Sequence, residues 1–214
     1  MTADVLRCNA NALEPVPLGV HGPEREIAPS ITASGFAGLI CQSGWVQQAE
    51  GSLLDSATRR CARNAVRSAV AAPGSSTPCS DLTAIDVAVH LVEVVEHFAA
   101  HESAGPDDGT LASRLAAAGE ALRRRWRELD PGAQWTVLLE MVVHSWDVSV
   151  AVEVSPDIPN ELATEILSGS RALLDRFRRV GTFAGPLVGE WHRPVDQLIA
   201  ETGRRPDWSD GADE

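Results

Sequence analysis

Apolar and small side chains recur three to four positions apart along most of the chain beyond residue 52, which is the spacing of one face of an α-helix. No segment shows a convincing two-residue alternation of the kind that marks a half-buried strand. We therefore expect an all-α protein, an antiparallel four-helix bundle with extra C-terminal helices. The predicted helices cover residues 53–72, 82–100, 110–129, 131–152, 159–180 and 194–202.

Capping residues predict where several of these helices begin and end. Ser80 or Asp81 stands where it could cap the second helix, and Asp130 followed by Pro131 has the pattern of an N-cap and a first helical residue. Gly203 follows the sixth helix, as glycine commonly does at a helix end. The connection between the third and fourth helices is accordingly very short.

Three regions differ in composition and predict the domain organisation. Residues 1–48 are rich in proline and glycine without sustained periodicity, which favours an irregular N-terminal arm or cap. Residues 49–208 hold the helical pattern and form the predicted bundle, and residues 209–214 read as an acidic tail.

The composition narrows the environment and the class of partner. No apolar run approaches the roughly 18 to 20 residues of a membrane span, and the four scattered cysteines form no pair typical of a disulfide framework. We expect a soluble, cytoplasmic protein. Its net charge of −12 disfavours nucleic acid and anionic membranes as partners and leaves a homodimer open. All 18 basic residues are arginines and tyrosine is absent, so a lysine Schiff base and a tyrosine acid are excluded.

Two polar residues interrupt the apolar segment 138–147 of the fourth predicted helix. Glu140 and His144 are four positions apart, so their Cβ atoms lie about 5–6 Å from each other on one face and could hold one ion. Buried without partners, they would cost several kcal/mol, so they need each other, a third group or a metal. His90, surrounded by apolar residues in the second helix, is the candidate third ligand. Taken alone, this spacing is also typical of two buried polar residues that pair with each other and bind no metal.

Four motifs carry a resemblance to a known family. With them the chain resembles, over residues 53–208, the actinobacterial metal-binding proteins related to mycothiol-dependent maleylpyruvate isomerase, which belong to the DinB-like four-helix-bundle superfamily. The motifs are TPC at 77–79, VAVHL at 87–91, EMVVHSWD at 140–147 and TGRRPDW at 202–208.

The resemblance implies that His90, Glu140 and His144 bind one divalent ion, most often zinc, with a fourth position open for water or substrate. It further implies a transferase or isomerase in which a small thiol such as mycothiol attacks a small electrophilic metabolite. Two alternatives stay open: a thiol-independent zinc enzyme, such as a cyclase, lyase or hydrolase of secondary metabolism, and a non-catalytic metal-stabilised binding protein.

Other polar residues in the motifs have two interpretations each. Asp147 could accept the free ring N–H of His144, and it is the first candidate for a catalytic group, but it could equally be a solvated or arginine-paired carboxylate. Cys79 is either a reactive thiol or a small buried side chain. Arg204 serves either ligand binding or packing of the last helix.

Two departures from the family pattern concern the walls of the pocket. Asp81 and Leu82 stand where relatives usually have glycine and tryptophan, and the connection at residues 130–132 is shorter than theirs. We therefore expect a different substrate, with the N-terminal arm replacing the missing wall.

Overall fold

The computed structural model describes residues 58–99 and 109–210, and within these ranges the chain is helical, which confirms the predicted all-α class. The described part contains no named strand, and its one β-bridge joins Ser76 to Thr83. None of its helices combines the length and the apolar character that crossing a membrane requires. The elements are α2 (Arg59–Ala71), α3 (Ala84–Phe98), α4 (Leu111–Arg125), the 3-10 turn η5 (Trp126–Glu128), α5 (Pro131–Ala151), α6 (Asn160–Gly169), α7 (Arg171–Arg179) and α8 (Pro194–Glu201).

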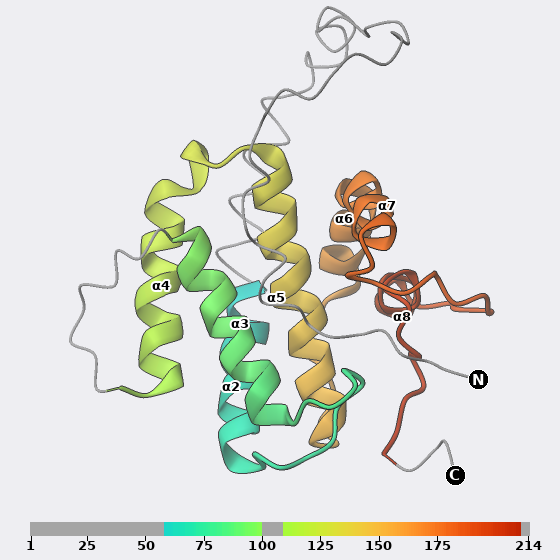
Figure 1. The fold of residues 1–214 in the computed structure, drawn as a ribbon, viewed down its shortest axis with the longest axis horizontal. Helices are drawn as coiled ribbons and strands as arrows, with labels where there is room; N and C mark the ends of the chain where they lie inside the picture. Colours follow the sequence, from blue (N-terminus) through green and yellow to red (C-terminus); the bar gives the residue numbers. More distant parts are fainter. Residues whose placement is uncertain (1–57, 100–108, 211–214) are drawn as a thin grey trace, which may run out of the picture.

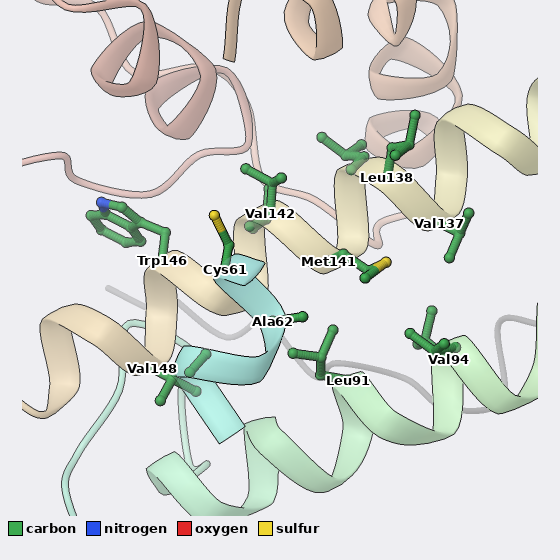
Figure 2. Close-up of a cluster of buried hydrophobic side chains, with 14 of the residues drawn as sticks. Cys61, Ala62, Leu91, Val94, Val137, Leu138, Met141, Val142, Trp146 and Val148 are labelled. Atoms are coloured by element: carbon green, nitrogen blue, oxygen red, sulfur yellow. The ribbon is translucent and has the colours of Figure 1, made fainter. Parts of the chain in front are cut away.

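Helices α2 to α5 pack side by side as a bundle (Figure 1). On the side of α5 away from α4, α6 and α7 contact α5, and α8 packs against α6 (Figure 1). The central helix is α5, which contacts α2 and α3 and is buried on almost every face. Figure 2 shows Ala62, Leu91 and Met141 meeting between these three helices, and each side chain is at most 1% exposed. Each buried leucine or methionine of this kind contributes about 1.5–3 kcal/mol. Because α5 is buried on almost every face, its side chains form the centre of the hydrophobic core.

The ends of α5 and α8 confirm the capping prediction. The Asp130 carboxylate accepts a hydrogen bond from the backbone N–H of Ala133 at 3.0 Å, and Pro131 follows at the first helical position. Gly203, after α8, has a φ of +80°, a left-handed conformation that glycine adopts without the usual steric cost.

The predicted cap of the second helix was wrong. Asp81 has a φ of +64° and stays outside α3, because the chain makes a tight turn in which Leu82 N–H donates to Cys79 carbonyl. Thr83 is the actual N-cap, and it forms a reciprocal capping box with Asp86. Helix α3 therefore begins a few residues later than a cap at Ser80 or Asp81 predicted.

The fifth predicted helix is in fact two helices, α6 and α7, which meet at Ser170. The buried Ser170 hydroxyl donates to the Ile166 carbonyl at 2.6 Å, and the same carbonyl accepts from the Ser170 backbone N–H at 2.9 Å. At Gly169 the ring of Trp135 lies where a side chain would be, since an added Cβ would come within 2.2 Å of it. The apolar periodicity continues through the break, so the sequence pattern alone does not reveal it.

Some predictions fall outside the described residues. These are the arm at 1–48, the start of the first helix at 53–57, the end of the second at residue 100 and the last part of the acidic tail at 211–214.

Candidate metal centre

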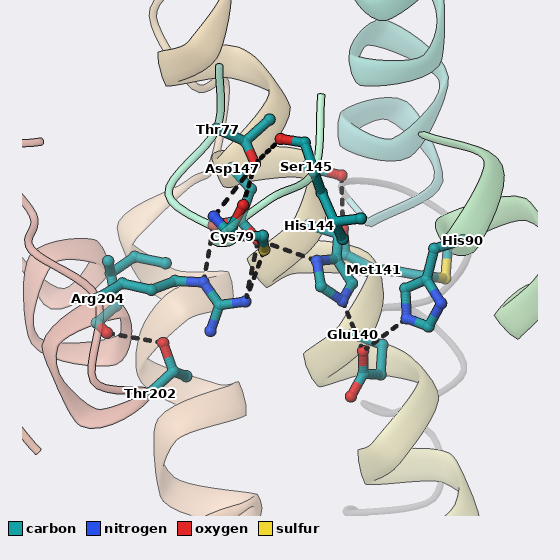
Figure 3. Close-up of polar contacts among 12 residues, drawn as sticks. Thr77, Cys79, His90, Glu140, Met141, His144, Ser145, Asp147, Thr202 and Arg204 are labelled. Carbon is teal, nitrogen blue, oxygen red and sulfur yellow. Dashed lines mark hydrogen bonds and ion pairs between the residues drawn. The ribbon is translucent and has the colours of Figure 1, made fainter. Parts of the chain in front are cut away.

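Three predicted ligands meet between α3 and α5. Glu140 and His144 lie one turn apart on α5, and His90 faces them from α3 (Figure 3). His144 Nε2 is 2.9 Å from Glu140 Oε2, and His90 Nε2 is 3.9 Å from the same oxygen. The two imidazole rings stand perpendicular, with centroids 4.9 Å apart. One donor atom from each residue lies within 4.8 Å of the others, so the predicted trio is brought together.

These spacings suit a single small cation. Donors that bind tetrahedral zinc at about 2.0–2.1 Å are roughly 3.3 Å from one another, and the two distances to Glu140 Oε2, 2.9 and 3.9 Å, lie on either side of that value. His144 is only 2% exposed, whereas the side chains of His90 and Glu140 keep 16% and 12% exposure. The approach from solvent is therefore on the side of His90 and Glu140.

The charges of the metal-free site are set by mutual contact. Burial raises the pKa of Glu140, but hydrogen bonds from His144 and His90 outweigh it and hold that pKa well below its usual range. Burial lowers the pKa of His144, but its contacts with Asp147, Cys79 and Glu140 prevail and raise that pKa well above 6.5. Without a metal, the site thus contains a carboxylate next to an imidazolium.

Asp147 lies behind His144, away from the solvent side. Its Oδ2 accepts a hydrogen bond from His144 Nδ1 at 2.9 Å. Arg204 donates hydrogen bonds to both carboxylate oxygens, from Nε to Oδ1 at 2.7 Å and from Nη2 to Oδ2 at 3.1 Å. Burial raises the pKa of Asp147, but Arg204 and His144 outweigh burial and lower it, so the residue is a carboxylate. Asp147 is fully buried, so it is not a solvated carboxylate; it contacts both the His144 ring N–H and the Arg204 guanidinium, the two partners considered from the sequence.

Cys79 completes a second cluster on the far side of His144. Its thiol lies 3.3 Å from Asp147 Oδ2 and 3.4 Å from Arg204 Nη2. Cys79, His144 and Asp147 could also offer three donors to a cation. However, the Arg204 guanidinium already occupies both Asp147 oxygens and places a positive charge beside the thiol. A cation is therefore better accommodated between His90, Glu140 and His144.

The TPC motif explains why Cys79 is in this position. Thr77 accepts a hydrogen bond from the Cys79 backbone N–H at 3.1 Å and donates to the Leu82 carbonyl at 2.8 Å, which fixes the turn before α3. Sequence reasoning left the roles of Cys79 and Arg204 undecided. The signal that could have found them is that the motifs holding them are the ones that carry the family resemblance.

Among the described residues, the other histidines and carboxylates that could have supported the site lie away from it. Asp86 caps α3 through Thr83 instead of supporting His90. His97 and His192 are exposed, and neither belongs to a set of donors close enough to share an ion among the described residues. His21 and His101 lie outside the described ranges.

Comparison with known proteins identifies relatives in Mycobacterium tuberculosis. The uncharacterized protein Rv0738 of strain H37Rv is 34% identical over 154 residues, which cover 61% of this chain and 84% of the relative. The uncharacterized protein MT0763 of strain CDC 1551 matches with the same identity and coverage. This chain belongs to the family of these two proteins. No family model and no solved structure matches it. Because both relatives are uncharacterized, the chemistry of the family has to be argued from the site itself.

Proposed function

We propose that this protein is a zinc-dependent enzyme in which a small thiol of the mycothiol type reacts with a small electrophilic metabolite, as in a transferase or an isomerase. The observation that carries the proposal is that the Nε2 atoms of His90 and His144 both face one carboxylate oxygen of Glu140. Two imidazoles and one carboxylate are the ligand set of zinc sites that leave a position open for a reactant.

The donor chemistry fits zinc better than a hard cation. Magnesium and calcium favour oxygen-only surroundings, whereas imidazole nitrogens favour zinc and related transition metals. His90, Glu140 and His144 would hold the ion. Bound zinc supplies a positive charge that keeps a thiol sulfur deprotonated near neutral pH.

The residues around the ligands determine how reactants would enter. The partial exposure of His90 and Glu140 favours entry of thiol and electrophile on their side, while the buried Asp147 holds His144 from behind. Asp147 has no exposed atoms for contact with a substrate, which supports a positioning role for it instead of the catalytic role considered from the sequence. The resemblance of the sequence motifs to those of the isomerase-related proteins favours a thiol as the co-reactant.

The first test measures metal content. Purified wild-type protein, His144→Ala and His97→Ala would be prepared identically and analysed by mass spectrometry of bound metals. We expect about one zinc per chain in the wild type and in His97→Ala, which changes an exposed histidine of the same helix as His90. Loss of zinc in His144→Ala supports the site, and equal trace metal in all three proteins contradicts it.

The second test measures thiol dependence. The zinc-loaded protein would be incubated with a panel of electrophiles, including a cis-unsaturated keto acid, an epoxide and an aryl halide, with and without mycothiol. We expect turnover only when the thiol is present. Turnover without any thiol would instead assign the protein to the thiol-independent zinc enzymes, and stoichiometric zinc without turnover would favour a binding protein.

A further inference from the structure

We infer that Arg204 is a positioning residue of the metal centre: it fixes Asp147, which in turn fixes His144, so that the segment after α8 controls a ligand presented by α5. The inference rests on the zinc site of the proposed function, and it assigns a role to the TGRRPDW motif that the sequence left undecided.

The contacts form one continuous chain through the buried interior. Arg204 is 3% exposed and makes a two-point contact with Asp147, at 2.7 and 3.1 Å. Asp147 Oδ2 in turn holds His144 Nδ1 at 2.9 Å, and His144 Nε2 faces Glu140 (Figure 3). Because a carboxylate accepts hydrogen bonds, Nδ1 must carry the proton. That leaves Nε2 as the ring nitrogen available to a metal.

The turn after α8 directs the side chain of Arg204 toward Asp147. Gly203 has a φ of +80°, and an added Cβ there would approach Ala184 Cβ at 2.6 Å and the Gly185 carbonyl at 3.0 Å. The turn that follows α8 is thus specific to glycine and packs tightly against residues 184–185. It directs Arg204 inward, over the ring of Phe183 at 5.5 Å from the ring centroid.

The two-point contact is the feature that makes Arg204 suited to positioning. A planar guanidinium fixes both oxygens of a carboxylate and hence the plane of the carboxyl group, whereas a lysine ammonium acts as a point charge. With Asp147 held in one orientation, the ring of His144 has one direction for its Nδ1 bond. Loss of the second point would let the carboxylate rotate and would weaken the hold on His144.

The test compares Arg204→Lys, Arg204→Gln and a matched control, Arg178→Gln. Arg178 lies in α7 and is paired with Asp175 and Glu201. None of its hydrogen bonds involves Asp147. Zinc dissociation constants would be measured by competition with a chromophoric chelator. The visible absorption of the cobalt-substituted proteins would report ligand geometry. Circular dichroism would select a temperature at which every variant is folded.

We expect both Arg204 variants to bind zinc about tenfold or more weakly than the wild type and to show an altered cobalt spectrum, as losses behind a metal-bound histidine typically do. Arg178→Gln should match the wild type in both measurements. Arg204→Lys keeps the charge, so its weakened binding separates positioning from simple charge compensation.

Three results would overturn the inference. Wild-type affinity and an unchanged cobalt spectrum in Arg204→Lys and Arg204→Gln would leave the zinc site in place but remove the role of Arg204. An equal loss in Arg178→Gln would reduce the effect to general destabilisation. Absence of zinc from the wild type itself would remove the proposed function together with the inference, so the two failures are distinguishable.

Discussion

At the scale of single residues, His144 is the centre of the site because both of its ring nitrogens are engaged. Nε2 faces Glu140 and Nδ1 faces Asp147, each at 2.9 Å. In the metal-free protein both nitrogens carry protons, since the two carboxylates raise the pKa of the ring well above 6.5. Zinc binding therefore requires that His144 release the proton on Nε2, while the one on Nδ1 stays with Asp147.

This exchange predicts a pH dependence of zinc binding. The apparent affinity for zinc should rise as the pH increases from about 6.5 toward the raised pKa of His144. At higher pH a smaller fraction of the His144 rings carries the proton that zinc has to displace. The folding stability of the metal-free protein should change in the opposite direction and fall as the pH rises. A raised histidine pKa stabilises the fold fully below 6.5, and that contribution is lost as the pH rises through the folded-state pKa.

Isothermal titration calorimetry at several pH values, in buffers of different ionisation enthalpy, would count the protons released on zinc binding. Urea unfolding of the metal-free protein over the same pH range would check the second expectation. His144→Gln provides the comparison, because it removes the titrating ring. A zinc affinity that does not change with pH in the wild type would contradict the assigned proton on His144.

At the scale of elements, the break between α6 and α7 shows how packing overrides a helical sequence pattern. Gly169 is the last residue of α6, and the Trp135 ring of α5 occupies the space beside it. Gly119 in α4 differs, because an added Cβ there would meet only Arg59 Nε, at an ordinary 3.7 Å.

The two glycines make a matched pair for substitution by alanine. Gly169→Ala should destabilise the protein by about 1–3 kcal/mol, because Trp135 has to move. Gly119→Ala should be neutral or stabilise it by up to about 1 kcal/mol through helix propensity. Urea denaturation of both variants measures the difference. Equal effects of the two substitutions would mean that Trp135 does not constrain the junction.

At the scale of the whole molecule, the candidate metal centre joins elements that are distant in the sequence. His90 comes from α3, Glu140 and His144 from α5, and Arg204 follows α8. An ion bound by the first three ligands would stabilise the folded state relative to the unfolded chain, where the ligands are separated.

Removal of the ion should therefore lower the melting temperature. At a free zinc concentration 100 times the dissociation constant, the expected stabilisation is about 2.7 kcal/mol. Thermal denaturation with zinc and with a chelator would show this difference in the wild type and in His97→Ala. His90→Ala should show less than the wild type. A melting temperature that the chelator leaves unchanged would indicate that no ion contributes to folded-state stability.

Local signals account for what was predictable in the fold. The periodicity of apolar residues gave the helical class, and Asp130 with Pro131 correctly marked the start of α5, because capping depends on residues a few positions apart. The same local reasoning misplaced the start of α3. The sequence around Ser80 and Asp81 also suits a cap, and only the turn fixed by Thr77 excludes them.

The sequence by itself determined the pairing of Glu140 with His144, since a spacing of four residues on a helix places two side chains on one face. It could propose His90 only as a candidate and from family resemblance, because the distance between α3 and α5 depends on how the bundle packs. The tertiary structure alone decided that Arg204, 57 positions beyond Asp147, holds that carboxylate, and that α6 ends at Gly169. Contacts of this kind follow from packing between distant segments, which no local spacing in the chain encodes.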